Sequence, residues 1–143
     1  MEIVRTVTVD RPVERVFDFL SDFTTTTEWD PGTIRTTREV GEGGVGTRYR
    51  NVSQFMGRQT ELTYVVEEVS PQRRLRLRGE NKSVVAHDTM TFTPTDTGGT
   101  TVTYRAQFDL KGLAKLSAPF LAPAFKRLGD EAEDGLRAAL ERL

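Results

Sequence analysis

The sequence predicts an α+β fold in which one curved antiparallel sheet of seven strands wraps around a long C-terminal helix. Apolar and polar side chains alternate along residues 2–10 and again between residues 33 and 110, and this period of two is typical of β-strands. Residues 13–20 and about 120–142 instead space their apolar side chains as a helix does. We expect a single domain over 1–143, because a chain of 143 residues can bury roughly 68–70% of its unfolded surface.

Two short helices are expected after the first strand. Pro12 fits the first position of a helix, where its missing N–H costs no hydrogen bond. The apolar stripe of the first helix, at i, i+3, i+4 and i+7, consists of Val13, Val16, Phe17 and Leu20. Ser21 and Asp22 can cap a second helical turn, which ends at the segment EWDPG. These helices are predicted to close one end of the curved sheet, with the only tryptophan, Trp29, at the mouth of the enclosed space.

The remaining strands and the last helix are separated by turn residues. Strands are predicted over 33–40, 46–56, 59–69, 73–80, 83–94 and 100–110. The segments GEGGVG, SPQ, GENK and DTGG, together with Gly57, mark the breaks between them. Pro119 and Pro123 place the start of the last helix between residues 118 and 124. One helix cannot cover a whole sheet of this size, so the short helices are needed at its end.

Composition excludes several classes of function. The chain has no cysteine, which excludes disulfides and thiolate metal sites. A net charge of -1 gives no electrostatic reason to expect a nucleic-acid partner. We expect no signal peptide, because the segment MEIVRTVTVDRP has no basic region followed by an apolar one. We expect no integral membrane association, because no stretch approaches the ~18 consecutive apolar residues of a membrane span. The expectation is a cytoplasmic monomer or homodimer with no cofactor and no metal.

Four segments resemble one known superfamily and together cover nearly the whole chain. They are RPVERVFDFLSDFTTTTEWDPGT, GEGGVGTRYR, VVEEVSPQRRLRLRG and DTMTFTPTDTGGTTVTYRAQF. The resemblance is to the START-like polyketide cyclase/dehydrase and lipid-transport superfamily, also called SRPBCC. It implies the helix-grip fold, with a deep cavity between the sheet and the C-terminal helix. Its members include lipid carriers, aromatic cyclases, hormone receptors, ring-hydroxylase subunits and co-chaperones, and no short motif here selects among them.

Three local motifs have simpler structural interpretations. The segment Gly41–Gly46 matches G-x-G-x-x-G but leads into an alternating strand, so it is predicted to be a hairpin connection instead of a nucleotide site. His87, the only histidine, cannot fill a zinc site with Asp88 alone. In RRLRLRG the two leucines are predicted to face the core, and the arginines to face solvent beside the glutamates of the preceding strand.

The hairpin between residues 83 and 110 determines which side chains face inward. A three-residue loop, Thr97–Gly99, would pair Phe92 with Tyr104, Met90 with Ala106 and Asp88 with Phe108. Asp88 would then point inward with the apolar set. His87 would point outward near Asp109.

The predicted concave face mixes polar with apolar side chains: Tyr49, Asn51, Ser53, Phe55, Leu62, Tyr64, Asp88, Met90, Phe92, Tyr104 and Phe108. Buried polar groups need partners, so either a wet or liganded cavity or a core with internal hydrogen bonds would accommodate them. The candidate ligand-binding residues are Trp29, Tyr49, Asn51, Phe55, Tyr64, Asp88, Met90, Phe92, Tyr104, Phe108 and Phe125.

Three functions remain open from the sequence. The first is binding or transport of a small apolar or aromatic ligand, such as a lipid or polyketide, because ligand sites are mostly apolar with a few placed polar groups. The second, allowed by the resemblance, is a polyketide aromatase/cyclase-type enzyme with Asp88 and Tyr104 as candidate catalytic groups. The third is a structural or co-chaperone domain with a filled core. We favour a binding protein, since no base is paired with an orienting group.

Overall fold

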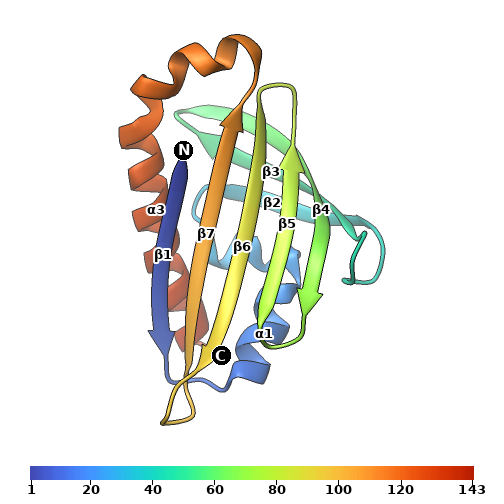
Figure 1. The fold of residues 1–143 in the computed structure, drawn as a ribbon, viewed down its shortest axis with the longest axis vertical. Helices are drawn as coiled ribbons and strands as arrows, with labels where there is room; N and C mark the ends of the chain where they lie inside the picture. Colours follow the sequence, from blue (N-terminus) through green and yellow to red (C-terminus); the bar gives the residue numbers. More distant parts are fainter.

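A seven-stranded antiparallel sheet curves around the C-terminal helix in the computed structural model, which describes all 143 residues (Figure 1). The strands are β1 (Glu2–Val9), β2 (Thr33–Val40), β3 (Arg48–Phe55), β4 (Arg58–Ser70), β5 (Arg74–Glu80), β6 (Val84–Pro94) and β7 (Thr100–Leu110). The helices are α1 (Val13–Ser21), α2 (Thr26–Trp29), α3 (Ala118–Glu141) and two 3₁₀ helices, η1 (Phe23–Thr25) and η2 (Gly112–Ser117). The order in the sheet is β1-β7-β6-β5-β4-β3-β2, so the first strand pairs with the last.

The helix-grip fold predicted from the sequence is confirmed. The short helices follow β1 as expected, and Asp22 caps η1 by accepting a 3.0 Å hydrogen bond from the Thr24 amide. Pro12 lies one position before the first helical residue, where its carbonyl accepts hydrogen bonds from the amides of Arg15 and Val16. The α3 helix begins at Ala118, inside the range that the two prolines predict.

The β6–β7 hairpin has a longer loop than predicted. Pro94 pairs with Thr100, so the loop spans the five residues 95–99. Thr95 closes it twice, since its amide donates to the Gly99 carbonyl at 3.0 Å and its hydroxyl accepts from the Gly99 amide at 2.9 Å. The register is therefore displaced by two residues from the predicted one. Met90 faces Tyr104, and Asp88 faces Ala106.

A displacement by two leaves every side chain on its predicted face. Asp88 is buried, with 5% of its surface exposed. His87 points outward, with its Nε2 3.7 Å from Asp109 Oδ2, although Gln107 is its direct partner across the strands. The inward and outward assignments of this hairpin are confirmed.

We expect His87→Ala to change the free energy of unfolding by less than about 1 kcal/mol, because an exposed ion pair contributes little. Ligand affinity should also stay unchanged, because His87 is on the outer face. Urea unfolding and a binding titration check both expectations. A large loss of binding in this variant would mean that the histidine acts on the cavity side.

The other local predictions also match the structure. The glycine-rich segment at residues 41–46 connects β2 to β3 and precedes no helix. Leu75 and Leu77 are buried in the core, while Arg74 on the outer face lies 3.7 Å from Glu68.

Helix α3 packs closely against α2 and β1 because two of its positions are glycine. A Cβ atom at Gly135 would lie 1.9 Å from the carbonyl oxygen of Trp29. A Cβ atom at Gly129 would lie 2.6 Å from Cγ2 of Ile3 in β1. The contact at Gly129 sets the distance between α3 and the sheet, and the contact at Gly135 sets the distance between α3 and α2. None of the helices combines the length and apolar character that crossing a bilayer requires.

Candidate functional site

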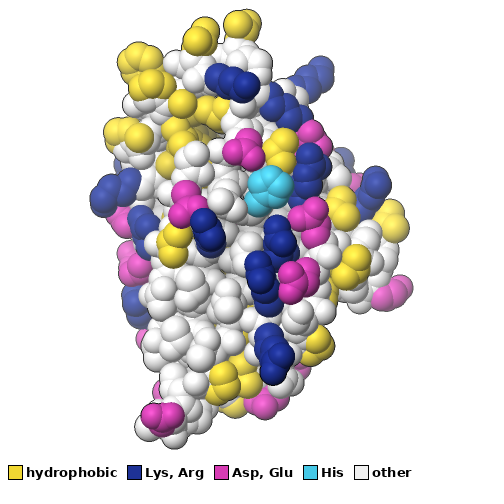
Figure 2. Space-filling model, viewed as in Figure 1, with side chains coloured by type: hydrophobic (Ala, Val, Ile, Leu, Met, Phe, Trp, Pro, Cys, Tyr) yellow, Lys and Arg dark blue, Asp and Glu magenta, His cyan; other side chains and the backbone are white.

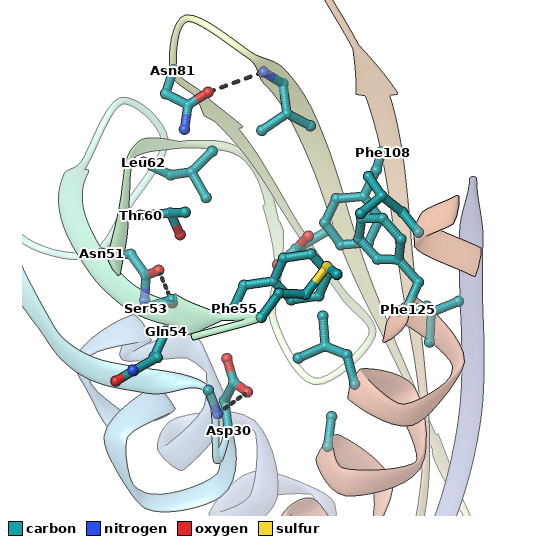
Figure 3. A pocket seen from close by; sticks show the side chains of 18 of the residues that line it. Asp30, Asn51, Ser53, Gln54, Phe55, Thr60, Leu62, Asn81, Phe108 and Phe125 are labelled. Atoms are coloured by element: carbon teal, nitrogen blue, oxygen red, sulfur yellow. Dashed lines mark hydrogen bonds between the residues drawn. The ribbon is translucent and has the colours of Figure 1, made fainter. Parts of the chain in front are cut away.

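A cavity of about 550 Å³ lies between the concave face of the sheet and α3 (Figure 3). Most of its wall comes from β3, β4, β6 and β7 on one side and from α2, η2 and α3 on the other. The lining residues that are exposed to solvent show where it opens: Gln54, Met56, Arg58 and Ser83. Its mouth therefore lies among the β3–β4 turn, the β5–β6 turn and η2.

Three phenylalanines from three elements form an apolar wall. The Phe125 ring of α3 lies 5.1 Å from the ring of Phe55 in β3 and 4.7 Å from the ring of Phe108 in β7, measured between centroids. All three line the cavity (Figure 3). Leu121 and Leu128 extend this surface along α3. This region offers a ligand dispersion contacts and no charged group.

The inner end of the cavity carries polar groups without partners. Nε1 of Trp29 and Oδ1 of Asp88 are buried and make no hydrogen bond within the chain, and no other buried side-chain nitrogen or oxygen atom lacks a partner. Tyr104 donates a 3.3 Å hydrogen bond to Oδ2 of Asp88, and its ring meets the Trp29 indole edge-on at 5.5 Å. Both unpartnered atoms therefore belong to residues that line this cavity and flank Tyr104.

Tyr64 reaches the same region because β5 has a glycine opposite it. Tyr64 pairs with Gly79 across β4 and β5, and a Cβ atom at Gly79 would lie 2.6 Å from Cε1 of the tyrosine ring. The ring therefore lies flat on the Gly79 backbone. Desolvation, then the nearby Asp88 carboxyl, raise the Tyr64 pKa well above its usual value, so the phenol stays protonated.

Burial raises the pKa of Asp88 to about 7. The nearby Asp30 carboxyl contributes to this rise in pKa, and the hydrogen bond from Tyr104 opposes it. Burial also raises the pKa of Asp30, against hydrogen bonds from Thr33 and from the Gly32 amide. Near neutral pH, Asp88 can therefore exist as a carboxylic acid that donates a hydrogen bond or as a carboxylate that accepts one.

A second polar group on the concave face is internally satisfied. The Asn51 amide donates to the Thr36 hydroxyl at 2.9 Å and accepts from the Ser53 hydroxyl at 2.6 Å. The Thr36 hydroxyl in turn lies 2.6 Å from that of Thr26 in α2. This network joins the sheet to α2, and Asn51 needs no ligand to complete its hydrogen bonds.

Eight of the eleven predicted site residues line this cavity: Trp29, Asn51, Phe55, Tyr64, Asp88, Tyr104, Phe108 and Phe125. The other three, Tyr49, Met90 and Phe92, lie in the core at the closed end of the sheet. There the Phe17 ring packs on Phe92 at 5.1 Å, and the Phe23 ring packs on Tyr49 at 5.7 Å. The short helices thus fill the space in front of these strands.

The prediction that Trp29 lies at the mouth is wrong. Only 3% of its surface is exposed, because α3 covers α2 through the contact at Gly135. Sequence reasoning also missed Asp30, whose neighbouring proline and glycine indicate only a turn. It missed the η2 residues Ala114 and Ser117 as well, which have no apolar periodicity strong enough to mark them. No three histidine, cysteine or acidic side chains gather as a metal site.

Comparisons with known proteins agree with this architecture. The model of the family described as polyketide cyclase/dehydrase and lipid transport matches residues 1–141. A comparison with curated proteins gives no match.

Solved structures show the same fold at low sequence identity. An aromatase/cyclase, Zhui, from a Streptomyces species is 16% identical with a TM-score of 0.84, over 99% of this chain and 94% of that one. A Thermus thermophilus protein is 19% identical with a TM-score of 0.81, over 98% and 97%. A START superfamily protein from Mycobacterium smegmatis is 17% identical with a TM-score of 0.73, over 99% and 94%. Identities this low establish the fold alone.

Proposed function

Because the chain belongs to the polyketide cyclase/dehydrase and lipid transport family, we propose that it binds a small apolar or aromatic molecule in the cavity beneath α3. The observation that supports this proposal most is that the cavity has an apolar outer part and a polar inner end. Its outer wall is built from phenylalanine and leucine, and its inner end has an indole N–H and a carboxyl oxygen without partners. Ligand sites commonly have this composition, an apolar surface with few polar groups that fix orientation.

The inner end favours a neutral polar group on the ligand. An unpaired buried donor or acceptor costs about 1–3 kcal/mol, so a ligand hydroxyl or carbonyl that reaches Trp29 or Asp88 recovers part of that cost. A ligand carboxylate would instead meet the carboxyls of Asp88 and Asp30, and Asp30 already raises the proton affinity of Asp88. Phenols, alcohols and ketones fit this end better than fatty-acid anions do.

A polyketide aromatase/cyclase-type activity is the second candidate. The observation in its favour is the Tyr104–Asp88 hydrogen bond at the cavity end, with the pKa of Asp88 near 7. A carboxyl with that pKa exchanges protons readily at neutral pH, and tyrosine can act beside it. The binding proposal needs only the cavity, so we rank it first. The third possibility, a filled core, fits poorly with a cavity of about 550 Å³.

A matched pair of probes tests the binding proposal. We expect 2-naphthol to bind at least tenfold more tightly than 2-naphthoate in calorimetric titrations near neutral pH. Both probes have the same ring system, but 2-naphthol carries a neutral hydroxyl and 2-naphthoate a charged carboxylate. Trp29→Phe removes the indole N–H and should weaken 2-naphthol binding several-fold. Met90→Leu, a conservative change in the closed core, is the control and should leave the affinity unchanged.

Two results would contradict the proposal. The first is that none of 2-naphthol, 2-naphthoate and the longer alcohol decan-1-ol binds, because the cavity would then lack its expected class of ligand. The second is equal affinity for 2-naphthol and 2-naphthoate, which would mean that Asp88 and Trp29 do not select a neutral polar group on the ligand.

A further inference from the structure

The segment that leads from β7 into α3 has two apolar faces. Its inner face, with Ala114, Ser117 and Leu121, lines the cavity. Its outer face carries Leu113, Leu116 and Phe120, which are 85%, 73% and 78% exposed. The spacing of three and then four residues places these three side chains on one stripe. A wall that only enclosed a ligand would need the inner face alone.

Across the mouth, Met56 in the β3–β4 turn is 63% exposed. We call Met56, Leu113, Leu116 and Phe120 the mouth surface. Figure 2 shows hydrophobic side chains gathered over η2 and the start of α3, with basic side chains beside them. Single exposed apolar residues are common, but a cluster beside an opening marks an interaction site.

The segment that carries most of the mouth surface is basic. Residues 111–129 include four basic residues and no acidic one, in a chain whose net charge is -1. Lys115 in η2, Arg58 at the β3–β4 turn and Lys82 at the β5–β6 turn take part in no ion pair. Lys111 does pair with Glu80. Three free cations therefore come from three separate segments to one end of the molecule.

We propose that the mouth surface docks onto an anionic phospholipid bilayer. The aliphatic and aromatic side chains enter the interfacial layer, and the lysine and arginine groups contact lipid phosphates. A second copy of the chain is a poorer occupant, because face-to-face association would bring the three free cations of each copy together. The contact is peripheral, and it goes beyond ligand binding in solution.

Docking in this orientation would place the cavity mouth against the lipid surface. Met56 belongs to the mouth surface and also lines the cavity, so the apolar surface continues from the bilayer side into the cavity. An apolar ligand could then pass between bilayer and cavity with little exposure to water. The inner apolar face of the segment would then contact the ligand, and its outer apolar face would contact the bilayer.

Vesicle flotation with the full chain tests the proposal. We expect binding to vesicles of equal parts phosphatidylcholine and phosphatidylglycerol, little binding to phosphatidylcholine alone, and weaker binding at high salt. Leu113→Ser combined with Phe120→Ser should lower the partition coefficient at least tenfold, and Lys115→Glu should lower it several-fold. Val45→Ser is the matched control, because Val45 is 69% exposed in the β2–β3 connection and should have no effect.

Three outcomes would overturn the proposal. They are no binding to anionic vesicles, an equal loss in the Val45→Ser control, and concentration-dependent dimerisation through Leu113 and Phe120 without vesicle binding. The double variant should keep its 2-naphthol affinity, since neither residue lines the cavity. Retained ligand affinity with lost flotation separates this surface from the cavity function. Lost ligand affinity in that variant would show that the substitutions act on the cavity instead.

Discussion

Asp88→Asn is expected to stabilise the protein by about 2–4 kcal/mol near pH 8, and by much less near pH 5. Burial raises the pKa of this carboxyl to about 7. Each tenfold difference in proton affinity between the folded and unfolded states is worth about 1.36 kcal/mol. Asparagine keeps the shape and can still accept the hydrogen bond from Tyr104, but it carries no charge to desolvate.

The direction of the pH dependence follows from proton binding. The unfolded chain loses the Asp88 proton near pH 3.9, whereas the folded protein keeps it until about pH 7. Between these values the folded state holds more protons, so the free energy of unfolding falls as the pH rises. The contribution of Asp88 is fully present below about pH 4 and is lost as the pH rises through 7.

Urea unfolding of both proteins across this pH range measures the effect. Asp109→Asn, at an exposed carboxyl on the neighbouring strand, is the control and should show no comparable gain. A constant difference between wild type and Asp88→Asn at all pH values would mean that Asp88 titrates in the fold as it does in the unfolded chain.

Gly135→Ala is expected to destabilise the protein by about 3 kcal/mol or more, although alanine is the better helix former by about 1 kcal/mol. The new Cβ atom would lie 1.9 Å from the Trp29 carbonyl oxygen, a backbone atom that cannot rotate away. Helix α3 must then move off α2, which also shifts the indole at the inner end of the cavity. Thermal unfolding and the Trp29 emission spectrum report the two effects.

Gly129→Ala provides the comparison within the same helix. Its Cβ atom would meet the side chains of Ile3 and Arg5, at 2.6 Å and 2.8 Å. The end of the arginine can move, so the loss should be smaller than at Gly135. A stabilising effect of Gly135→Ala would show that α3 and α2 are not in contact as described.

Strand and helix placement was predictable because each depends on local pattern. Alternation marked every strand to within two residues, and the prolines bounded the start of α3. The β6–β7 register depends instead on one threonine that closes a five-residue loop, a contact with no periodic signal. The error in register was two residues, and an even displacement keeps each side chain on the same face of the sheet. Asp88 was therefore placed on the correct side.

The cavity itself was only partly predictable. Alternation tells which face a side chain is on, but gives no information about its depth along the strand. Met90 and Phe92 share a face with Asp88, yet α1 packs over Phe92 and leaves Asp88 open to the cavity. Where the short helices dock depends on long-range packing, such as Gly135 against Trp29. The predicted position of Trp29 at the mouth was wrong for the same reason.

The pairing of β1 with β7 has a consequence for synthesis of the chain. Glu2 pairs with Gln107, and α3, which packs on β1, follows later still. The N-terminal strand therefore has no sheet neighbour until β7, Thr100–Leu110, has also been synthesised. Closing so long a loop is entropically costly, and contacts this distant slow folding. The apolar residues of the concave face therefore stay uncovered until α3 has been synthesised, and a chain that exposes them is prone to aggregate.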